Sequence, residues 1–415
     1  MPEAKYLLVG SSHAALEALR AIRQVDTEGS VAMVTRDAHL PYSPTVLPYV
    51  VSGRSKADRV SLRDGDFFTA ENCTFVPRAS AVSLDAGRKR VTLSTGDTWA
   101  YEKLLIATGS APVLPPIPGL DTVTVHVLRS LDDALALRAA MGTASRAVVL
   151  GGGLVGLHAA ENLAEAGLSV SVIEMQGQVL SGYFDAKASL RIEDAFAAHG
   201  VRLFLGRRAT RVASQDGDGV AVTLDDGRVV EADLLLVAAG VRPVVDWLAG
   251  SGIAIDRGIV VDDTMRTNLP DVWAAGDVAQ AKDFASGDTA LIGIIPTAVE
   301  HGRTAGRDMA GDSYLRPYEG GLPVNTYRFF GRVALSIGRA AASEGVEVAE
   351  SEDRGYRRIV MSDGRLVGYA SVDEPFDVGI MGELIRRRVD LGPVREAFLA
   401  RPLETGRRLM SEGWR

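Results

Sequence analysis

The 415-residue sequence predicts an α/β protein built from two similar units and a smaller C-terminal one. Two observations lead to this prediction. Strands and helices alternate along most of the chain, and a strand–turn–helix–strand pattern with glycine in the turn opens twice, near residues 6 and 147. At about 150 residues per domain, the length fits two or three domains. A hydrophobic content of 47% with 24% charged residues is typical of a globular chain rather than a disordered one.

The first opening is a strand at residues 6–9, the turn GSSHAA at residues 10–15, a helical run at 16–23 and a strand at 31–35. This order is a βαβ unit, but its turn matches the dinucleotide-binding pattern G-x-G-x-x-G/A poorly. Ser12 replaces the middle glycine, which normally lets the backbone approach a pyrophosphate. The residues alone therefore fit a dinucleotide turn and an ordinary βα turn equally well.

The second opening matches the same pattern much better. A strand at residues 147–150 leads into GGGLVG at 151–156, a helix at 158–166 and a strand at 169–173. Gly151 permits the turn, Gly153 lets the backbone meet a pyrophosphate, and Gly156 lets the helix pack on the strand. The helix N-terminus offers partial positive charge to a diphosphate.

Glu174 ends the last strand of this second opening, 23 residues after Gly151. Its carboxylate can accept hydrogen bonds from both ribose hydroxyls and would repel a 2′-phosphate. The following residues, 175–177, contain no arginine that could bind such a phosphate. The sequence therefore predicts NAD(H) rather than NADP(H) at this turn.

The two units share one plan beyond their openings. Apolar strands at 104–109 (LLIATG) and 234–240 (LLLVAAG) each follow a strand pair with a turn, and each precedes a proline, Pro112 or Pro243. This duplication of plan implies two nucleotide sites. A third strand, at 272–275, ends in Gly276-Asp277 and is followed by a helix-like run at 298–310.

Taken in this order, the motifs resemble the FAD-dependent pyridine nucleotide–disulfide oxidoreductase superfamily over about residues 5–310. The resemblance implies two Rossmann-like domains, with FAD in the first and NAD(H) in the second. It divides the chain into an FAD-binding domain at 1–112 and 244–319, an NAD-binding domain at 113–243, and a small α+β interface domain at 320–415.

The resemblance also implies site residues. Asp277 would bond the ribityl chain of FAD, and residues 297–298 would start a helix aimed at the flavin pyrimidine. Thr35 stands where an acid is expected, which leaves Asp37 or backbone groups for the adenosine ribose. Arg129 fits an FAD-contacting arginine and a surface arginine equally well. The expected FAD contacts are Gly10, Ser11, Ser12, His13, Ala14, Thr35, Arg36, Asp37, Ser43, Pro44, Val82, Ala107, Thr108, Gly109, Arg129, Gly276, Asp277, Pro296, Thr297 and Ala298. The expected NAD(H) contacts are Gly151, Gly153, Leu154, Val155, Gly156, Glu174, Ala239 and Gly240.

The sequence departs from the disulfide reductases at their redox centre. Residues 41–49 (PYSPTVLPY) contain no cysteine, and Thr45 stands near the place where single-cysteine relatives need a thiol. The one cysteine, Cys73, precedes a predicted strand and is expected to be structural. A single cysteine excludes an intrachain disulfide and a redox dithiol, and no metal site is expected. His158 stands where many relatives have glutamate, and we expect it to pack.

Without a thiol, electrons must pass between the flavin and a partner. Residues 11–18 and 40–49 resemble the FAD/NAD-binding subunits of anaerobic multi-subunit oxidoreductases, such as phenylglyoxylate dehydrogenase and tungsten-dependent aldehyde oxidoreductases. This implies hydride transfer between the two cofactors with no catalytic side chain, an iron–sulfur partner subunit and a substrate-oxidising subunit for aldehydes or 2-oxoacids. The alternatives are a free-standing NADH-dependent ferredoxin or rubredoxin reductase, and a flavin-binding sensor, which would need no intact NAD turn.

Charge and hydropathy bear on three further possibilities: nucleic-acid binding, membrane insertion and secretion. A net charge of −8 disfavours general nucleic-acid binding, which needs an excess of lysine and arginine on one face. The sequence shows no apolar run of about 18 residues, so no membrane span is expected. The first residues do not have the pattern of a signal peptide, and a cytoplasmic protein is expected.

Overall fold

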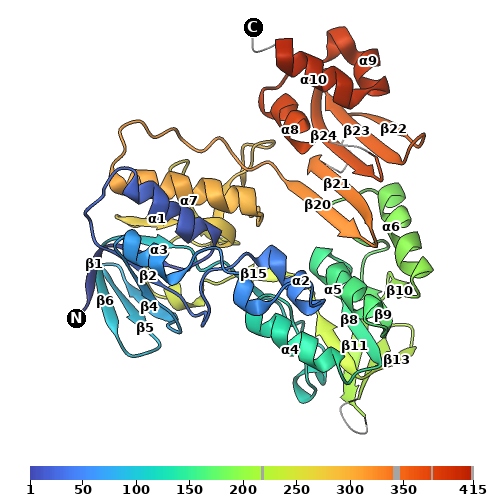
Figure 1. Cartoon of the computed structure of the whole chain (residues 1–415), viewed down its shortest axis with the longest axis horizontal. Helices are drawn as coiled ribbons and strands as arrows, with labels where there is room; N and C mark the ends of the chain where they lie inside the picture. The colour runs from blue at the N-terminus through green and yellow to red at the C-terminus, as the bar shows by residue number, and fades with distance from the viewer. Residues whose placement is uncertain (216–218, 340–345, 375–376, 413–415) are drawn as a thin grey trace.

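A computed structural model describes residues 1–215, 219–339, 346–374 and 377–412. It shows three units, each built on its own main sheet, with the C-terminal unit joined to the rest through a long connection (Figure 1). The α/β class expected from the sequence is confirmed. Within the described residues, no helix is long and apolar enough to cross a membrane.

The first unit is a sheet of mixed direction in the order β3-β2-β1-β6-β5-β4, with β17 pairing in parallel to β6. The chain leaves this unit after β7 (Ser110–Pro112) and returns to it from about residue 244, in a segment that includes β17 and α7. Its elements are β1 (Glu3–Val9), α1 (His13–Arg23), β2 (Val31–Val34), α3 (Gly65–Ala70), β3 (Cys73–Val76), β4 (Ala81–Asp85), β5 (Arg90–Leu93), β6 (Thr98–Ile106), β17 (Val272–Ala274) and α7 (Ile295–Ala310).

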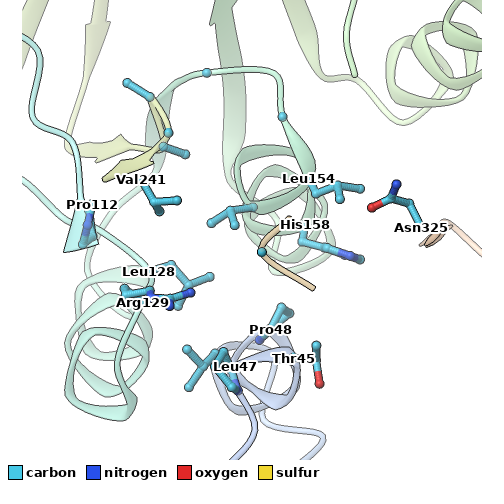
Figure 2. A pocket seen from close by; sticks show the side chains of 18 of the residues that line it. Thr45, Leu47, Pro48, Pro112, Leu128, Arg129, Leu154, His158, Val241 and Asn325 are labelled. Atoms are coloured by element: carbon cyan, nitrogen blue, oxygen red, sulfur yellow. The ribbon is translucent and has the colours of Figure 1, made fainter. Parts of the chain in front are cut away.

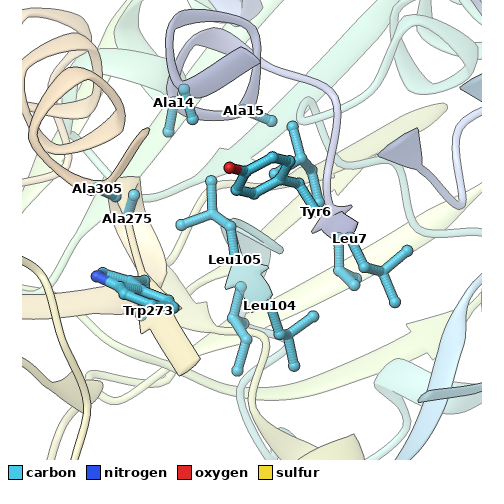
Figure 3. Packing of buried hydrophobic residues seen from close by; sticks show 14 of the residues in the cluster. Tyr6, Leu7, Ala14, Ala15, Leu104, Leu105, Trp273, Ala275 and Ala305 are labelled. Carbon is cyan, nitrogen blue, oxygen red and sulfur yellow. The ribbon is translucent and has the colours of Figure 1, made fainter. Parts of the chain in front are cut away.

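Helices α1 and α7 lie side by side on this sheet (Figure 1). Glycines on α7 allow this approach, because a Cβ on Gly302 would lie 2.1 Å from the carbonyl oxygen of Ala14. Below the helices, Leu105 and Trp273 pack between the strands and the two helices (Figure 3). The buried strands position the turns that follow them.

The second unit is a parallel sheet in the order β10-β9-β8-β14, joined to an antiparallel meander, β11-β12-β13. Its elements are α4 (Leu131–Met141), β8 (Arg146–Leu150), α5 (Leu154–Glu165), β9 (Ser169–Glu174), α6 (Ala186–Ala198), β10 (Arg202–Leu205), β11 (Ala209–Ser214), β12 (Val220–Leu224), β13 (Val229–Ala232) and β14 (Leu234–Val237).

The matching strands of the two units meet each other. Strand β7 (Ser110–Pro112) pairs antiparallel with β15 (Val241–Pro243), so that Pro112 faces Val241 and Pro243 faces Ser110. The two prolines that mark the duplicated plan in the sequence thus end the two strands of one short ribbon. This ribbon carries the chain between the units.

The C-terminal unit is an antiparallel sheet in the order β20-β21-β24-β23-β22, packed against helices. Its elements are β20 (Val324–Phe329), β21 (Arg332–Gly338), β22 (Glu347–Ser351), β23 (Tyr356–Ser362), β24 (Arg365–Val372), α8 (Val378–Arg386), α9 (Arg395–Ala400) and α10 (Pro402–Glu412). The shorter elements of the chain are α2 (Leu47–Val51), β16 (Ile259–Val260), β18 (Ala279–Lys282) and β19 (Thr289–Ala290).

Several element boundaries differ from the predicted ones. Helix α1 begins at His13 rather than Leu16, α5 at Leu154 rather than His158, and α7 at Ile295 rather than Ala298. Each helix starts directly after an extended residue, so the first helical turn includes residues that resemble a loop in the sequence. Strand β20 and helix α6 were not predicted from the sequence. Cys73 is the buried first residue of β3 rather than a residue before it.

Candidate cofactor site

A cavity of about 1780 Å³ lies between the units. It is lined by both glycine turns, by the start of α7, by residues 44–45 and 47–49, and by residues of β20. Figure 2 shows Thr45 and Pro48 on one side, with His158 and Leu154 of α5 facing them. A single small-molecule pocket usually measures about 300–1,000 Å³, so this cavity has room for more than one ligand.

The first turn brings the backbone of Gly10 against the end of β6. Gly10 has φ +125°, and a Cβ there would lie 2.1 Å from the carbonyl oxygen of Ala107. The Ser11 hydroxyl donates to Thr35 Oγ1 at 3.0 Å, which ties the turn to the end of β2. Asp37 already accepts hydrogen bonds at both oxygens, from the Tyr42 hydroxyl at 2.6 Å and from the backbone of His39 at 3.1 Å.

The second turn has the same close approach at Gly151. Its φ is +115°, and a Cβ would lie 2.3 Å from the carbonyl oxygen of Ala238. The Glu174 carboxylate accepts from the backbone N–H of Gly152 at 2.6 Å and of Gln176 at 2.8 Å. A side chain at Gly152 would begin 3.1 Å from Glu174 Cγ. Sequence reasoning missed this need for Gly152, although three consecutive glycines are a visible signal.

Asp277 and Arg129 form the polar centre of the cavity. Arg129 Nη2 donates to Asp277 Oδ2 at 2.8 Å, and the Ser110 hydroxyl donates to the same oxygen at 2.9 Å. Arg129 Nε donates to the Ser110 carbonyl at 3.1 Å. The Arg129 side chain is 25% exposed and lines the cavity. Beside this group, Pro296 at the start of the 16-residue helix α7 lines the cavity, and the N-terminus of such a helix favours negative charge.

The residues near the expected thiol position carry hydroxyls and an imidazole. Thr45 Oγ1 lies 2.8 Å from Ser43 Oγ, and Ser43 Oγ lies 3.0 Å from His13 Nε2. His158 lies on the other side of the cavity, as Figure 2 shows. Its ring packs edge-on against Tyr327 at 4.8 Å, and burial together with nearby Arg54 lowers its pKa to about 4. His158 therefore both packs, as expected, and faces the cavity.

Eighteen of the expected contacts line this cavity: Ser12, His13, Ala14, Pro44, Ala107, Gly109, Arg129, Gly276, Asp277, Pro296, Ala298, Gly151, Gly153, Leu154, Val155, Glu174, Ala239 and Gly240. The others lie outside its lining: Gly10, Ser11, Thr35, Arg36, Asp37, Ser43, Val82, Thr108, Thr297 and Gly156. Among these residues, Val82 lies on β4 with 48% of its surface exposed. Cavity residues that sequence reasoning missed include Arg54, Glu161, Asn325, Arg328 and Arg332, some of which reach it from the C-terminal unit.

The lone thiol is far from reactive. Cys73 is buried at the start of β3, at the sheet edge of the first unit, and burial raises its pKa to about 12. A thiol with such a pKa stays protonated and is a poor nucleophile at neutral pH. In the described ranges, no three His, Cys, Asp or Glu side chains gather in a way that could hold a metal ion.

Two dinucleotide-type turns facing one cavity define an oxidoreductase that brings two nucleotide cofactors together. Residues 4–302 match the pyridine nucleotide-disulphide oxidoreductase family, and the chain belongs to this family. It is an oxidoreductase that uses FAD and NAD(H). The two glycine turns fit this cofactor pair, since in each of them a Cβ on the first glycine would collide with the carbonyl oxygen that follows the neighbouring strand.

Named relatives extend the comparison over the whole chain. The chain is 51% identical over 415 residues to the NADH-dependent phenylglyoxylate dehydrogenase subunit epsilon of Aromatoleum evansii, covering 99% of this chain and 98% of that protein. It is 29% identical to a rubredoxin-NAD(+) reductase of Pseudomonas putida over 312 residues, 75% of this chain and 81% of that one. The crystal structure of a ferredoxin reductase from Rhodopseudomonas palustris superposes with a TM-score of 0.80 at 28% identity, covering 89% and 91% of the two chains.

Proposed function

We propose that this chain passes electrons between NAD(H) and an iron–sulfur partner subunit of a larger complex that oxidises an aldehyde or a 2-oxoacid. The observation that carries the proposal is the absence of a thiol relay. The sequence holds one cysteine, and that cysteine is buried in β3 while Thr45 lines the cavity. Electrons therefore leave or enter the flavin through another protein rather than through a protein disulfide.

Similarity over the full length supports the role as a subunit. The relative from Aromatoleum evansii is named as one subunit of an NADH-dependent dehydrogenase and matches this chain along nearly its whole length. Because the similarity covers both chains almost completely, each unit of this chain has a counterpart in the relative. A substrate-oxidising subunit, which could hold tungsten or another cofactor, would complete the complex. A cytoplasmic location goes with the proposal, because NAD(H) is the soluble electron carrier it requires.

In this proposal the predicted domains and contacts keep their roles. Residues 1–112 and 244–319 form the FAD-binding domain, and residues 113–243 form the NAD-binding domain. Residues 320–415 form the interface domain. FAD supplies hydride exchange with the nicotinamide. The chain would position the cofactors: Glu174 would hold the adenosine ribose of NAD(H), and Asp277, whose Oδ2 accepts from Arg129 and Ser110, would hold the ribityl chain of FAD.

The decisive experiment is a native purification followed by identification of the subunits and metal analysis. Iron, acid-labile sulfide and a substrate-oxidising subunit should co-purify in fixed ratio, and NADH should reduce both flavin and iron–sulfur centres. A chain that purifies alone and reduces added ferredoxin or rubredoxin would select the alternative, a free-standing reductase. The similarity to the rubredoxin and ferredoxin reductases is the observation that favours this alternative.

The thiol can be tested separately by Cys73→Ser. We expect flavin reduction by NADH and onward electron transfer to remain within about twofold, since a buried thiol with a raised pKa takes no part in either. Stopped-flow absorbance measures both steps, and Cys73→Ala controls for the new hydroxyl. Loss of onward transfer in both variants would show that the thiol carries electrons.

A further inference from the structure

We propose that Asn162 is a positioning residue for hydride transfer, because it fastens a segment of the first unit to the helix that follows the second glycine turn. We call this segment, residues 41–54, the wall segment, since several of its residues line the cavity. The inference rests on the proposed placement of FAD in the first unit and NAD(H) in the second, and not on the proposed partner. With no catalytic side chain in the hydride step, the rate depends on how the chain places the two cofactors.

The wall segment belongs to the first unit in sequence but packs into the core of the second. Four of its side chains lie in the same hydrophobic cluster as residues of α4 and α5: Tyr42, Leu47, Val50 and Val51. The cluster under the first sheet is a separate one. Figure 2 shows Pro48 of this segment facing α5. The second unit therefore holds the wall segment in place.

Asn162 is the polar link within this apolar contact. It lies on α5 and is only 2% exposed. Its Nδ2 donates to the carbonyl oxygen of Pro48 at 2.9 Å, and its Oδ1 accepts from Arg54 Nη2 at 3.3 Å. A second bond lies nearby, since Arg138 Nη1 on α4 donates to the carbonyl oxygen of Val50 at 3.1 Å. One buried amide thus holds the wall segment both within α2 and just beyond it.

The other end of the wall segment is tied to the first glycine turn. Ser43 Oγ lies 3.0 Å from Nε2 of His13, the first residue of α1. Helix α5, which carries Asn162, begins directly after Gly153 in the second turn. A short series of contacts therefore joins the helix of one turn to the helix of the other. These are the two turns proposed to hold FAD and NAD(H).

This link predicts an effect on the rate of hydride transfer rather than on binding. The hydride moves with its electron pair from the nicotinamide ring to the flavin ring, and a misplacement of about 1 Å can cost about 10²-fold in rate. Asn162 does not line the cavity itself, whereas α5 and the wall segment both do. It therefore acts through its neighbours, and its loss should leave the contacts of Glu174 and the glycine turns unchanged.

Matched substitutions separate this role from a general effect on stability. Asn162→Leu keeps a similar volume and removes both hydrogen bonds. Asn162→Asp keeps an acceptor for Arg54 but cannot donate to Pro48. Gln178→Leu is the control, because Gln178 Nε2 donates to the carbonyl oxygen of Phe184 at 3.0 Å, a bond that lies within the second unit. Gln178 does not line the cavity either.

The measurements use the flavin-loaded protein without oxygen. Stopped-flow absorbance at increasing NADH concentration gives the limiting rate of flavin reduction and, separately, the Kd for NADH. Titration of the reduced protein with NAD⁺ gives the long-wavelength charge-transfer absorbance, which reports how the two rings are stacked. Thermal unfolding and flavin content report the structural cost of each substitution.

We expect both Asn162 variants to slow the limiting rate by about ten- to a hundredfold and to weaken the charge-transfer absorbance. The Kd for NADH should stay within about threefold, as for a group that acts on the reacting step. Gln178→Leu should lower thermal stability but keep the rate and the absorbance. Arg138→Met, which removes the second bond to the wall segment, should slow the rate by less than the Asn162 variants. It also provides the test if the Asn162 variants fail to fold.

Three results would overturn this role. Unchanged limiting rates in Asn162→Leu and Arg138→Met would exclude it directly. Equal slowing by Gln178→Leu would show that overall stability, and not the link between the units, governs the rate. A raised Kd with an unchanged limiting rate would make Asn162 a support for NADH binding only. Failure of NADH to reduce the flavin in the unchanged chain would instead contradict the proposed function, so the two failures can be distinguished.

Discussion

The turns at Gly10 and Gly151 start alike but secure their helices differently. In both, a Cβ on the first glycine would lie within 2.1–2.3 Å of a carbonyl oxygen at the end of a neighbouring strand. In the second turn, Gly156 passes so close to Gly151 that its Cβ would lie 2.0 Å from the carbonyl oxygen. In the first turn, Ala15 occupies the matching position, and the close contact comes instead from Gly302 of α7 against Ala14.

This difference shows that the first turn accepts a Cβ at Ala15 and that the close approach there is instead a contact with a distant helix. Helix α7 covers the first turn, and about 290 residues separate Gly302 from the turn it faces. The second turn has a more open surface, with Val155 44% exposed and Met175 66% exposed. A covered turn suits a cofactor that stays bound, and an open turn suits one that exchanges in every cycle.

Replacing the first glycine of the covered turn should have the largest effect. Gly10→Ala combines a positive φ with a Cβ 2.1 Å from a carbonyl oxygen, and we expect a loss of about 3 kcal/mol or more in unfolding free energy together with loss of FAD. Urea unfolding and bound-flavin absorbance measure both. Gly96→Ala is the control, because its φ is +90° but nothing lies within 4 Å. Equal losses in the two variants would show that strain, and not the close approach, is what matters.

Replacing Gly302, the glycine on α7 that faces the first turn, should have the next largest effect. Gly302→Ala places a Cβ 2.1 Å from the Ala14 carbonyl oxygen within a helix, and we expect it to lower stability by about 1–3 kcal/mol and to weaken FAD retention. Gly156→Ala should instead leave FAD bound and weaken NADH. Flavin content and NADH titration distinguish the two outcomes. If both variants lose the same cofactor, the two turns are not separate cradles.

The sequence predicts the second turn better than the first, and the reason is physical. The strand, the glycines and Glu174 are all local, so their spacing can be read from about 25 consecutive residues. The first turn depends on α7 and β17, which return to it after a whole unit, and single-sequence patterns do not report such contacts. Arg129 shows the same limit, because its partner Asp277 lies 148 residues away.

The cavity residues of the C-terminal unit could not be predicted from the sequence either, for a related reason. Asn325 and Arg328 lie on β20, a strand whose polar residues give it no clear alternation in the sequence. Its place is set by packing of Tyr327 and Phe329 against the second unit. The residues that follow family motifs were predictable, and those that depend on how the units dock were not.

Replacing Glu174, the acidic residue of the second turn, should have a moderate effect. Glu174→Ala should weaken NADH binding by about ten- to a hundredfold, because hydrogen bonds to a charged group contribute about 1.5–3 kcal/mol. FAD content should not change, since Glu174 lies at the other turn. Glu174→Gln, which can still accept from Gly152, should lose less. Unchanged NADH affinity in Glu174→Ala, measured by titration of the flavin-loaded protein, would remove the ribose role.

The matching position in the covered turn is Thr35, and it should have the smallest effect. Its Oγ1 accepts from the Ser11 hydroxyl at 3.0 Å and from the backbone N–H of Asp37 at 3.2 Å. Thr35→Val keeps the shape but leaves both donors without this acceptor, which should cost about 1 kcal/mol of stability. Thr35→Ser restores the acceptor and should recover most of it. If Thr35→Val instead weakens FAD binding as strongly as Glu174→Ala weakens NADH binding, the hydroxyl binds the cofactor itself, and the two strand ends are more alike than their residues indicate.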